Sequence, residues 1–327
     1  MTAPAGVPLA SVLRSGLVES VHSGHLLVRD ARSDLVVLGD PDAVIWPRSA
    51  VKPLQAVALL RAGLRVDDDG LALAASSHEG TPVHLDIVRR LLGEAGLAEP
   101  DLRNTPDLPL GKDAAAQWLA AGRGPSSLTQ NCSGKHAAML LTCVQAGWDP
   151  AGYLDPEHPL QRRVRSTVED LAGVAVERVG VDGCGAPLFS TTLRGLARAF
   201  ARIATAEAGT PEHRVARAVA QHPALVGGPH RGVTAVLESV PGILAKDGAD
   251  GVFAAALPDG SCLALKVSDG GDRPVRAVVA DALLRIAPRE HHEAVRAMGR
   301  TEVLGHGLPV GEVVSVLRTA EPAAEAG

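Results

Sequence analysis

Segments that resemble β-strands lie near both ends of this 327-residue chain, with helical patterns between them. Near the N-terminus, β-prone runs on either side of Ser23-Gly24 predict a hairpin, and residues 34–39 form a further strand. Late in the chain, apolar runs at 251–257 and 261–267 flank a Pro-Asp-Gly turn. Hairpins pair neighbouring strands in antiparallel fashion. The sequence therefore predicts an α/β fold in which an antiparallel sheet, built from N- and C-terminal strands, is flanked by helices.

The middle of the chain is predicted to be mostly helical. Residues 54–64 have helical spacing, and helical patterns dominate from about 84 to 209. Residues 71–76 form a short apolar run that we interpret as a buried strand. We expect one domain over residues 1–320 with a helical insert, followed by a disordered tail at 321–327, which has no apolar face.

Composition excludes several classes of protein. Hydrophobic residues make up 46% of the chain, which is enough for a full-sized core. The net charge of −5, with only three Phe, three Trp and one Tyr, argues against the basic and aromatic surfaces of nucleic-acid binders. No apolar run reaches the roughly 18 residues needed to span a bilayer, and no signal-peptide pattern opens the chain. We therefore expect no nucleic-acid or membrane partner, and a cytoplasmic location.

The first motif with chemical meaning is Ser49-Ala-Val-Lys52, followed by Pro53. Side chains three residues apart share one face of a helical turn, and Pro53 belongs in a first turn. A serine at a helix entrance, beside a desolvated and therefore neutral lysine, is suited to nucleophilic attack. The alternative is that Ser49 caps the helix and Lys52 is solvated.

Two further segments carry polar residues next to apolar runs. Ser76-Ser77 with His78 and Glu79 follows a run that we interpret as a strand, where either catalytic groups or a helix N-cap are common. Lys266 lies inside an apolar strand, where burying its charge would be costly without a partner. Either Lys266 has a functional role or ion pair, or it reaches water from the strand end.

Cysteines occur in two Gly-containing turns, Asn-Cys132-Ser-Gly-Lys135-His136 and Asp182-Gly-Cys184-Gly. Two thiols with a histidine nearby could hold a zinc ion that keeps a fourth position open. The alternative is a pair of buried free thiols.

Taken in order, the segments WPRSAVKPLQ, ASSHEG, NCSGKH, DGCGAP and LALKVSDGG resemble the rhizobial-type L-asparaginases. The resemblance runs from about Arg14 to Asp272 and involves five separate segments. It implies a fold related to serine β-lactamases, penicillin-binding proteins and glutaminases, and a homodimer. It also implies that Ser49 and Lys52 form one catalytic tandem, and Ser77 and Lys266 a second.

The same resemblance implies a Zn²⁺ site formed by Cys132, Lys135 and Cys184, with His136 beside the metal and the substrate. Chemistry alone would have favoured His136 over Lys135 as a ligand. By charge matching, we expect Arg48 and Asp182 to hold the α-carboxylate and α-ammonium groups of the substrate.

The reaction implied is hydrolysis of L-asparagine to L-aspartate and ammonia through an acyl-enzyme on Ser49. A glutaminase or another serine amidohydrolase is an alternative within the same chemistry. A non-catalytic, zinc-stabilised amino-acid-binding protein is the alternative outside it, but that reading gives Lys266 no function.

Overall fold

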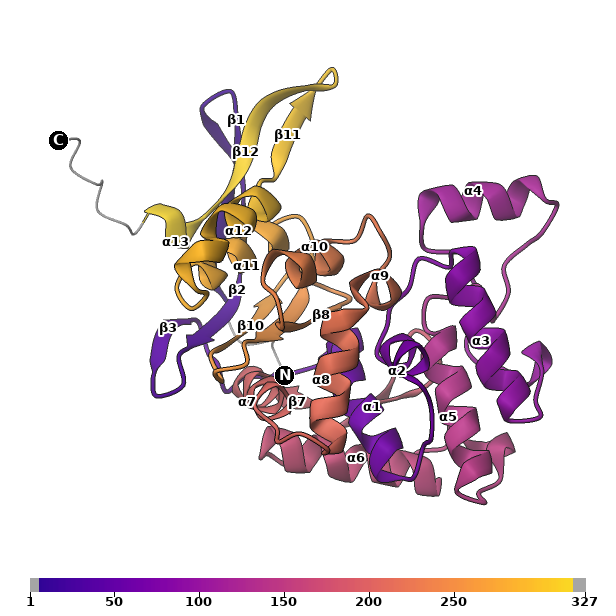
Figure 1. Cartoon of the computed structure of the whole chain (residues 1–327). Coiled ribbons are helices and arrows are strands. Elements are labelled where there is room, and N and C mark those ends of the chain that lie inside the picture. The colour runs from indigo at the N-terminus through magenta and orange to yellow at the C-terminus, as the bar shows by residue number, and fades with distance from the viewer. Residues whose placement is uncertain (1–5, 320–327) are drawn as a thin grey trace.

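The N- and C-terminal parts of the chain meet in one antiparallel sheet (Figure 1). The structure is a computed structural model that describes residues 6–319, so the predicted tail at 321–327 lies outside the described residues. The strands pair in the order β11-β12-β1-β2-β10-β9-β8, with β3 added on β2. Strand β2 from the N-terminal part joins β10 from the C-terminal part, which confirms the predicted α/β fold class.

The eight strands of this sheet are β1 (Val7–Arg14), β2 (Leu17–Arg29), β3 (Asp34–Leu38), β8 (Leu244–Gly248), β9 (Val252–Ala256), β10 (Cys262–Val267), β11 (Glu302–Gly305) and β12 (Leu308–Ser315). Two small sheets pair β4 (Val44–Ile45) with β7 (Thr191–Thr192), and β5 (Val179–Val181) with β6 (Pro187–Phe189).

The helical middle region fills the space beside the sheet, as predicted (Figure 1). Its helices are α1 (Lys52–Arg61), α2 (Asp68–Ala74), α3 (Pro82–Glu94), α4 (Lys112–Ala120), α5 (Ser133–Gln145), α6 (Pro159–Ala172), α7 (Leu193–Ala204), α8 (Pro211–Gln221), α9 (Pro223–Val226) and α10 (Gly232–Ser239). After the sheet come α11 (Val275–Leu283), α12 (His292–Gly299) and α13 (Val316–Thr319). Short 3-10 turns are η1 (Arg48–Val51), η2 (Glu99–Asp101), η3 (Pro150–Gly152) and η4 (Arg289–His291).

Strand β10 lies inside the sheet and is buried along almost its whole length. It pairs with β2 on one side and β9 on the other, while α7 and α11 pack against it. Continuous burial explains the near-unbroken apolar run Cys-Leu-Ala-Leu-Lys-Val, since both faces of such a strand are covered. Lys266, near the end of the strand, is half-buried.

The predicted strand at 71–76 is wrong, because these residues form the end of α2 and the turn after it. Asp67 caps the helix by accepting a hydrogen bond from the Gly70 N–H at 2.9 Å. Two aspartates in the first turn stabilise the helix, because their negative charges lie at the positive end of its dipole. A short buried run of Leu and Ala is compatible with a helix as well as a strand, so its periodicity does not distinguish the two.

The predicted hairpin at Ser23-Gly24 is also wrong, because β2 runs straight through these residues. The chain reverses instead at Ser15-Gly16, where both residues have positive φ (48° and 84°). Gly24 has a packing role: a Cβ there would lie 2.1 Å from the Lys266 carbonyl oxygen. Glycine at this position therefore lets β2 and β10 approach each other.

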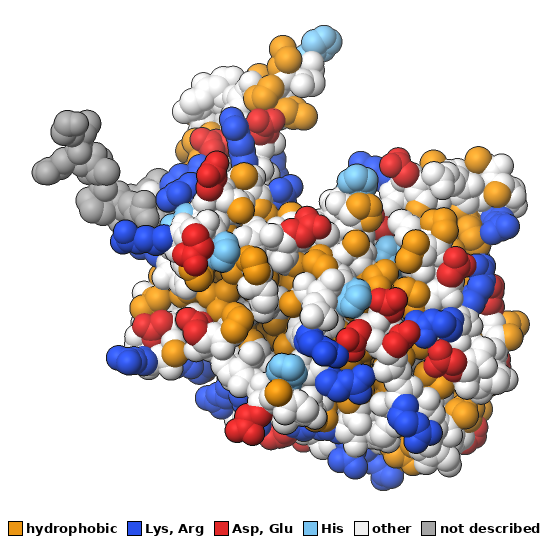
Figure 2. All heavy atoms as spheres, viewed as in Figure 1, with side chains coloured by type: hydrophobic (Ala, Val, Ile, Leu, Met, Phe, Trp, Pro, Cys, Tyr) orange, Lys and Arg blue, Asp and Glu red, His pale blue; other side chains and the backbone are white. Residues whose placement is uncertain are grey.

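Within residues 6–319, none of the helices combines the length and the apolar character required to cross a bilayer. On the face of the molecule drawn in Figure 2, acidic and basic side chains lie interspersed with hydrophobic ones.

Candidate active site

Ser49 lies in the 3-10 turn η1, which leads directly into α1. The Ala50 N–H donates to the Pro47 carbonyl at 3.1 Å, and the Lys52 N–H donates to the Ser49 carbonyl. Pro53 occupies the first turn of α1, where its missing N–H costs no helical hydrogen bond. Ser49 therefore stands at a helix entrance, as its sequence context predicts.

Strand β8 passes unusually close to this turn. A Cβ on Gly248, the last residue of β8, would lie 2.6 Å from the Pro47 carbonyl oxygen and 3.0 Å from the Ala50 nitrogen. Because side-chain carbons do not approach other atoms so closely, glycine is what allows β8 to pack on the turn. The end of β8 is thereby placed beside Ser49.

Lys52 is buried, with 1% of its surface exposed. Its Nζ donates to the Ser77 Oγ at 3.0 Å and to the Ser76 carbonyl oxygen. The Ser77 N–H donates to the Val226 carbonyl at 2.9 Å, which fixes the backbone that carries this hydroxyl. The structure thus joins the first motif to the second through Lys52.

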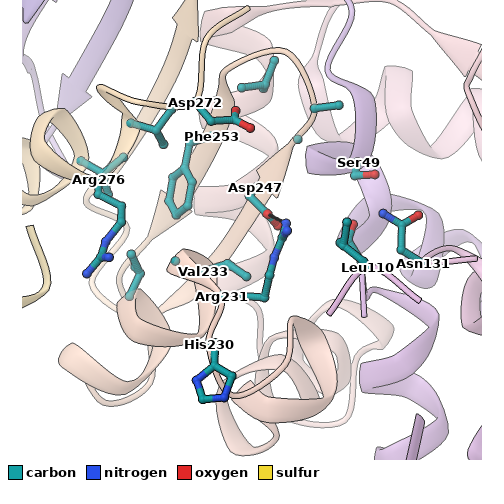
Figure 3. A pocket seen from close by; sticks show the side chains of 18 residues that line it. Ser49, Leu110, Asn131, His230, Arg231, Val233, Asp247, Phe253, Asp272 and Arg276 are labelled. Atoms are coloured by element: carbon teal, nitrogen blue, oxygen red, sulfur yellow. Dashed lines mark hydrogen bonds and ion pairs between the residues drawn. The ribbon is translucent and has the colours of Figure 1, made fainter. Parts of the chain in front are cut away.

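A cavity of about 440 Å³ opens beside these groups (Figure 3). Ser49, Ser77 and Asn131 line it, together with Arg231 and Asp247. Figure 3 shows Ser49 and Asn131 on one side of the cavity, with Arg231 and Asp247 facing them. Two hydroxyl groups and a pair of opposite charges therefore border one space.

Lys266 lies on a different cavity, of about 380 Å³, which Arg48 and Trp46 also line. Its Nζ donates to the Asp250 carbonyl at 2.6 Å. Burial lowers the pKa of Lys266, and the nearby carboxylate of Asp250 opposes that shift. Among the hydrogen bonds within residues 6–319, Ser77 is paired with Lys52 and not with Lys266, so the structure does not bring the expected second tandem together.

Arg48 is held by two carboxylates. Its Nε donates to Asp182 Oδ1 at 2.8 Å, and its Nη1 pairs with Asp250. Arg48 itself has a positive φ of 49°, in the left-handed region that few non-glycine residues adopt. The two residues expected to bind substrate charges, Arg48 and Asp182, are therefore paired with each other.

The cysteine turns meet in a small buried cluster of Cys132, Cys184 and Ala186. The Lys135 Nζ lies 3.1 Å from the Cys184 Sγ. A hydrogen bond from the Cys132 thiol lowers the pKa of Cys184 to about 5, and the Lys135 ammonium adds to this shift against the effect of burial. Cys184 is therefore a thiolate at neutral pH, the form in which cysteine binds metals.

The three predicted zinc ligands converge, and two sulfurs with one nitrogen form a donor set that zinc accepts. Lys135 is fully buried, yet the neighbouring sulfurs raise its pKa above the usual lysine range. Lys135 would consequently have to release a proton before its nitrogen could bind a metal. Within the described part of the chain, no group of three or more His, Cys, Asp or Glu side chains is arranged to hold a metal. The predicted set contains only two such residues, in addition to its lysine.

His136 is completely buried and lines neither of the two cavities. Its Nδ1 shares a hydrogen bond of 2.8 Å with the Tyr153 hydroxyl, and the two rings meet edge to face. Burial lowers the pKa of His136 well below its usual value, and Lys135 lowers it further. The His136 ring is therefore buried against Tyr153, and it borders neither cavity.

Sequence reasoning gave no role to Lys246, although the structure buries it completely. Its Nζ pairs with the Asp247 carboxylate and donates to the Asp247 carbonyl at 2.8 Å. Burial lowers the pKa of Lys246 to about 8, despite the opposite charge of Asp247. The position of Lys246 after the apolar Ile243-Leu-Ala was the available signal, since a solvated lysine is not expected there.

Comparisons with known proteins identify the family. The model of the L-asparaginase II family matches residues 10–315, nearly the whole chain. Among solved structures, a β-lactamase from Mycobacterium bovis is similar, with 15% sequence identity, a TM-score of 0.40, and coverage of 84% of this chain and 94% of that one. At this similarity the neighbour says nothing about the chemistry of this chain. A search of curated proteins gave no match.

The family match confirms the resemblance seen in the five motifs, all of which lie within the matched residues. It also favours an enzyme over the non-catalytic interpretation. The chain belongs to the L-asparaginase II family and is an asparaginase-type amidohydrolase.

Proposed function

We propose that this protein hydrolyses L-asparagine to L-aspartate and ammonia through an acyl-enzyme on Ser49. The observation that carries the proposal is that Ser49 and Ser77 line one cavity while the buried Lys52 bonds to Ser77 behind them. A hydroxyl nucleophile and an amine at one site are the parts that acyl transfer requires.

In the proposed first step, the Ser49 Oγ forms a bond to the side-chain amide carbon of asparagine. The unprotonated form of Lys52 takes the serine proton. The hydrogen bond between Lys52 and Ser77 gives that proton a route through the Ser77 hydroxyl to the amide nitrogen. The carbon–nitrogen bond then breaks, ammonia leaves, and an aspartyl ester remains on Ser49.

In the second step, a water molecule attacks the ester carbon and gives one proton to Lys52. The ester bond to Ser49 breaks, and Lys52 returns the proton to the serine oxygen. Aspartate is released and the site is restored. Backbone N–H groups of the Ser49 turn would stabilise the oxyanion in both steps, at about 3 kcal/mol per donor in other enzymes.

Lys266 enters this proposal through Arg48. Its ammonium holds the Asp250 carbonyl, and the Asp250 carboxylate pairs with Arg48, which directly precedes Ser49. We propose that this group of charges fixes the backbone of the Ser49 turn. Lys266 is then a positioning residue for the nucleophile.

Ammonia release from L-asparagine and from L-glutamine tests the proposed function. We expect L-asparagine to be preferred by about 10- to 200-fold in kcat/KM, the range that one methylene allows. Equal rates, or a preference for glutamine, would assign the site to a glutaminase. Absence of ammonia from both would refute the proposal.

We further propose that Cys132, Lys135 and Cys184 hold Zn²⁺, because their donor atoms converge in a buried cluster that contains a thiolate. When bound, the ion would supply positive charge beside Asp182, whose carboxylate lies 3.7 Å from the Cys184 sulfur. The homodimer and the cytoplasmic location belong to the same proposal, since the resemblance and the cysteine usage imply them.

Cys132→Ala is expected to abolish zinc binding. Elemental analysis should find about one zinc per chain in the wild type and nearly none in the variant, because two ligands cannot hold the ion tightly. Cys143→Ala, which removes another buried thiol on α5, is the matched control and should keep its zinc. A wild-type protein that binds no zinc from a zinc-containing buffer would rule out the site. If Cys132→Ala loses zinc and only its melting temperature falls, the ion is structural.

A further inference from the structure

Two charged side chains on the cavity, and a buried lysine behind them, have no part in the steps proposed above. They are Arg231, which precedes α10, and the adjacent Lys246 and Asp247 of β8. The Arg231 Nη2 donates to Asp247 Oδ2 at 2.5 Å, and Lys246 pairs with the other oxygen, Oδ1. Burial opposes ionisation of Asp247, yet Lys246 and Arg231 together hold its pKa well below its usual range.

This cluster contains two cations and one anion, so its net charge is positive. Lys246 is buried and forms an ion pair with Asp247, whereas the Arg231 side chain is 30% exposed and lines the cavity. Arginine has five N–H donors, and within residues 6–319 the Arg231 side chain uses one of them, on Asp247. Donors that match a carboxylate are therefore left at the cavity wall.

The group of charges around Arg48 has a negative net charge. Arg48 pairs with both Asp182 and Asp250, so one cation faces two carboxylates. The remaining carboxylate on the cavity, Asp272, accepts the Gly251 N–H at 3.3 Å and forms no ion pair with Arg231 among the described residues. Arg231 is consequently the better site for a carboxylate ligand.

We propose that Arg231, held by Asp247 and Lys246, binds the free α-carboxylate of the substrate while the side-chain amide lies at Ser49. The inference rests on the proposed function, and it adds the residue that selects substrates with a free α-carboxylate. The cavity would select amides of free amino acids, because an amide without that carboxylate leaves the cluster's positive charge unpaired.

The test compares Arg231→Gln with the wild type on two substrates. One is L-asparagine, and the other is L-asparagine α-amide, in which a neutral carboxamide replaces the carboxylate. We expect Arg231→Gln to lower kcat/KM for L-asparagine by about 10- to 100-fold, mainly through KM, because a charge-assisted contact is lost. The rate with the α-amide should change little, so the preference between the substrates collapses. Arg231→Lys keeps the positive charge but lacks the paired donors of the guanidinium group, so its kcat/KM for L-asparagine should lie between those of the wild type and Arg231→Gln.

Arg276→Gln is the matched control, since Arg276 borders the same cavity but donates to the Met298 carbonyl at 2.6 Å. It should keep the wild-type preference. Equal losses on both substrates in Arg231→Gln would overturn the inference, and so would a collapse of preference in Arg48→Gln alone. Calorimetry with L-aspartate gives a second readout that does not depend on turnover. Arg231→Gln should weaken L-aspartate binding by a similar factor, and an unchanged affinity would overturn the inference. A wild-type protein that releases no ammonia would instead refute the proposed function.

Discussion

Replacing Ser49 by alanine is expected to reduce ammonia release from L-asparagine by about 10³- to 10⁶-fold. The variant lacks the oxygen that forms the ester, so only the binding and polarising groups of the cavity remain. The turn itself should persist, because the hydrogen bonds that define it use backbone atoms. Steady-state kinetics with coupled ammonia detection, together with circular dichroism, measures both effects.

Ser239→Ala is the matched control for this experiment. Ser239 is also buried, but its hydroxyl donates to the Val236 carbonyl within α10, away from Lys52. We expect near wild-type turnover from it. If Ser49→Ala keeps more than about a tenth of the wild-type rate, Ser49 is not the nucleophile. If Ser49→Ala stays active while Ser77→Ala loses activity, the nucleophile is Ser77.

Lys52→Met is the second substitution with a large expected effect, a loss of about 10²- to 10⁴-fold in kcat. Methionine occupies a similar volume in this buried position but accepts no proton. The change also leaves the Ser77 hydroxyl and the Ser76 carbonyl without their partner. Such a loss costs roughly 1–3 kcal/mol of stability per buried group, so thermal unfolding should be measured beside turnover.

Lys112→Met gives the comparison, because Lys112 is exposed at the start of α4. Its kinetics and melting temperature should match the wild type. A Lys52→Met variant with lowered stability and turnover within about tenfold of the wild type would show that Lys52 has only a structural role. Recovery of activity at high pH in this variant, where hydroxide replaces the missing base, would support the proposed role.

The sheet could be predicted where its pairings are local. The β9–β10 hairpin is marked by its own turn residues, and two strand-rich ends suggested one sheet. The hairpin of β11 and β12 was not predicted, because few of its residues are buried and β12 pairs with β1 from the other end of the chain. Such long-range pairing leaves no short periodic pattern in the sequence.

The candidate site, like the sheet, could be predicted from the sequence only in part. The motif order identified the segments that carry Ser49, Lys52 and the cysteines, but side-chain partners depend on how the segments pack. Lys52 reaches Ser77 because α1 and the end of α2 lie together, whereas Lys266 is directed to Asp250. No spacing along the chain distinguishes these two outcomes.

The most direct test of the central claim is whether two substrates pass through one acyl-enzyme. L-Asparagine and the β-methyl ester of L-aspartate release ammonia and methanol, respectively, but would leave the same aspartyl ester on Ser49. With hydroxylamine present, we predict the same ratio of aspartyl hydroxamate to aspartate from both substrates, since both products arise from one intermediate. A ratio that depends on the leaving group would mean that water attacks the substrate directly, which would contradict the acyl-enzyme mechanism.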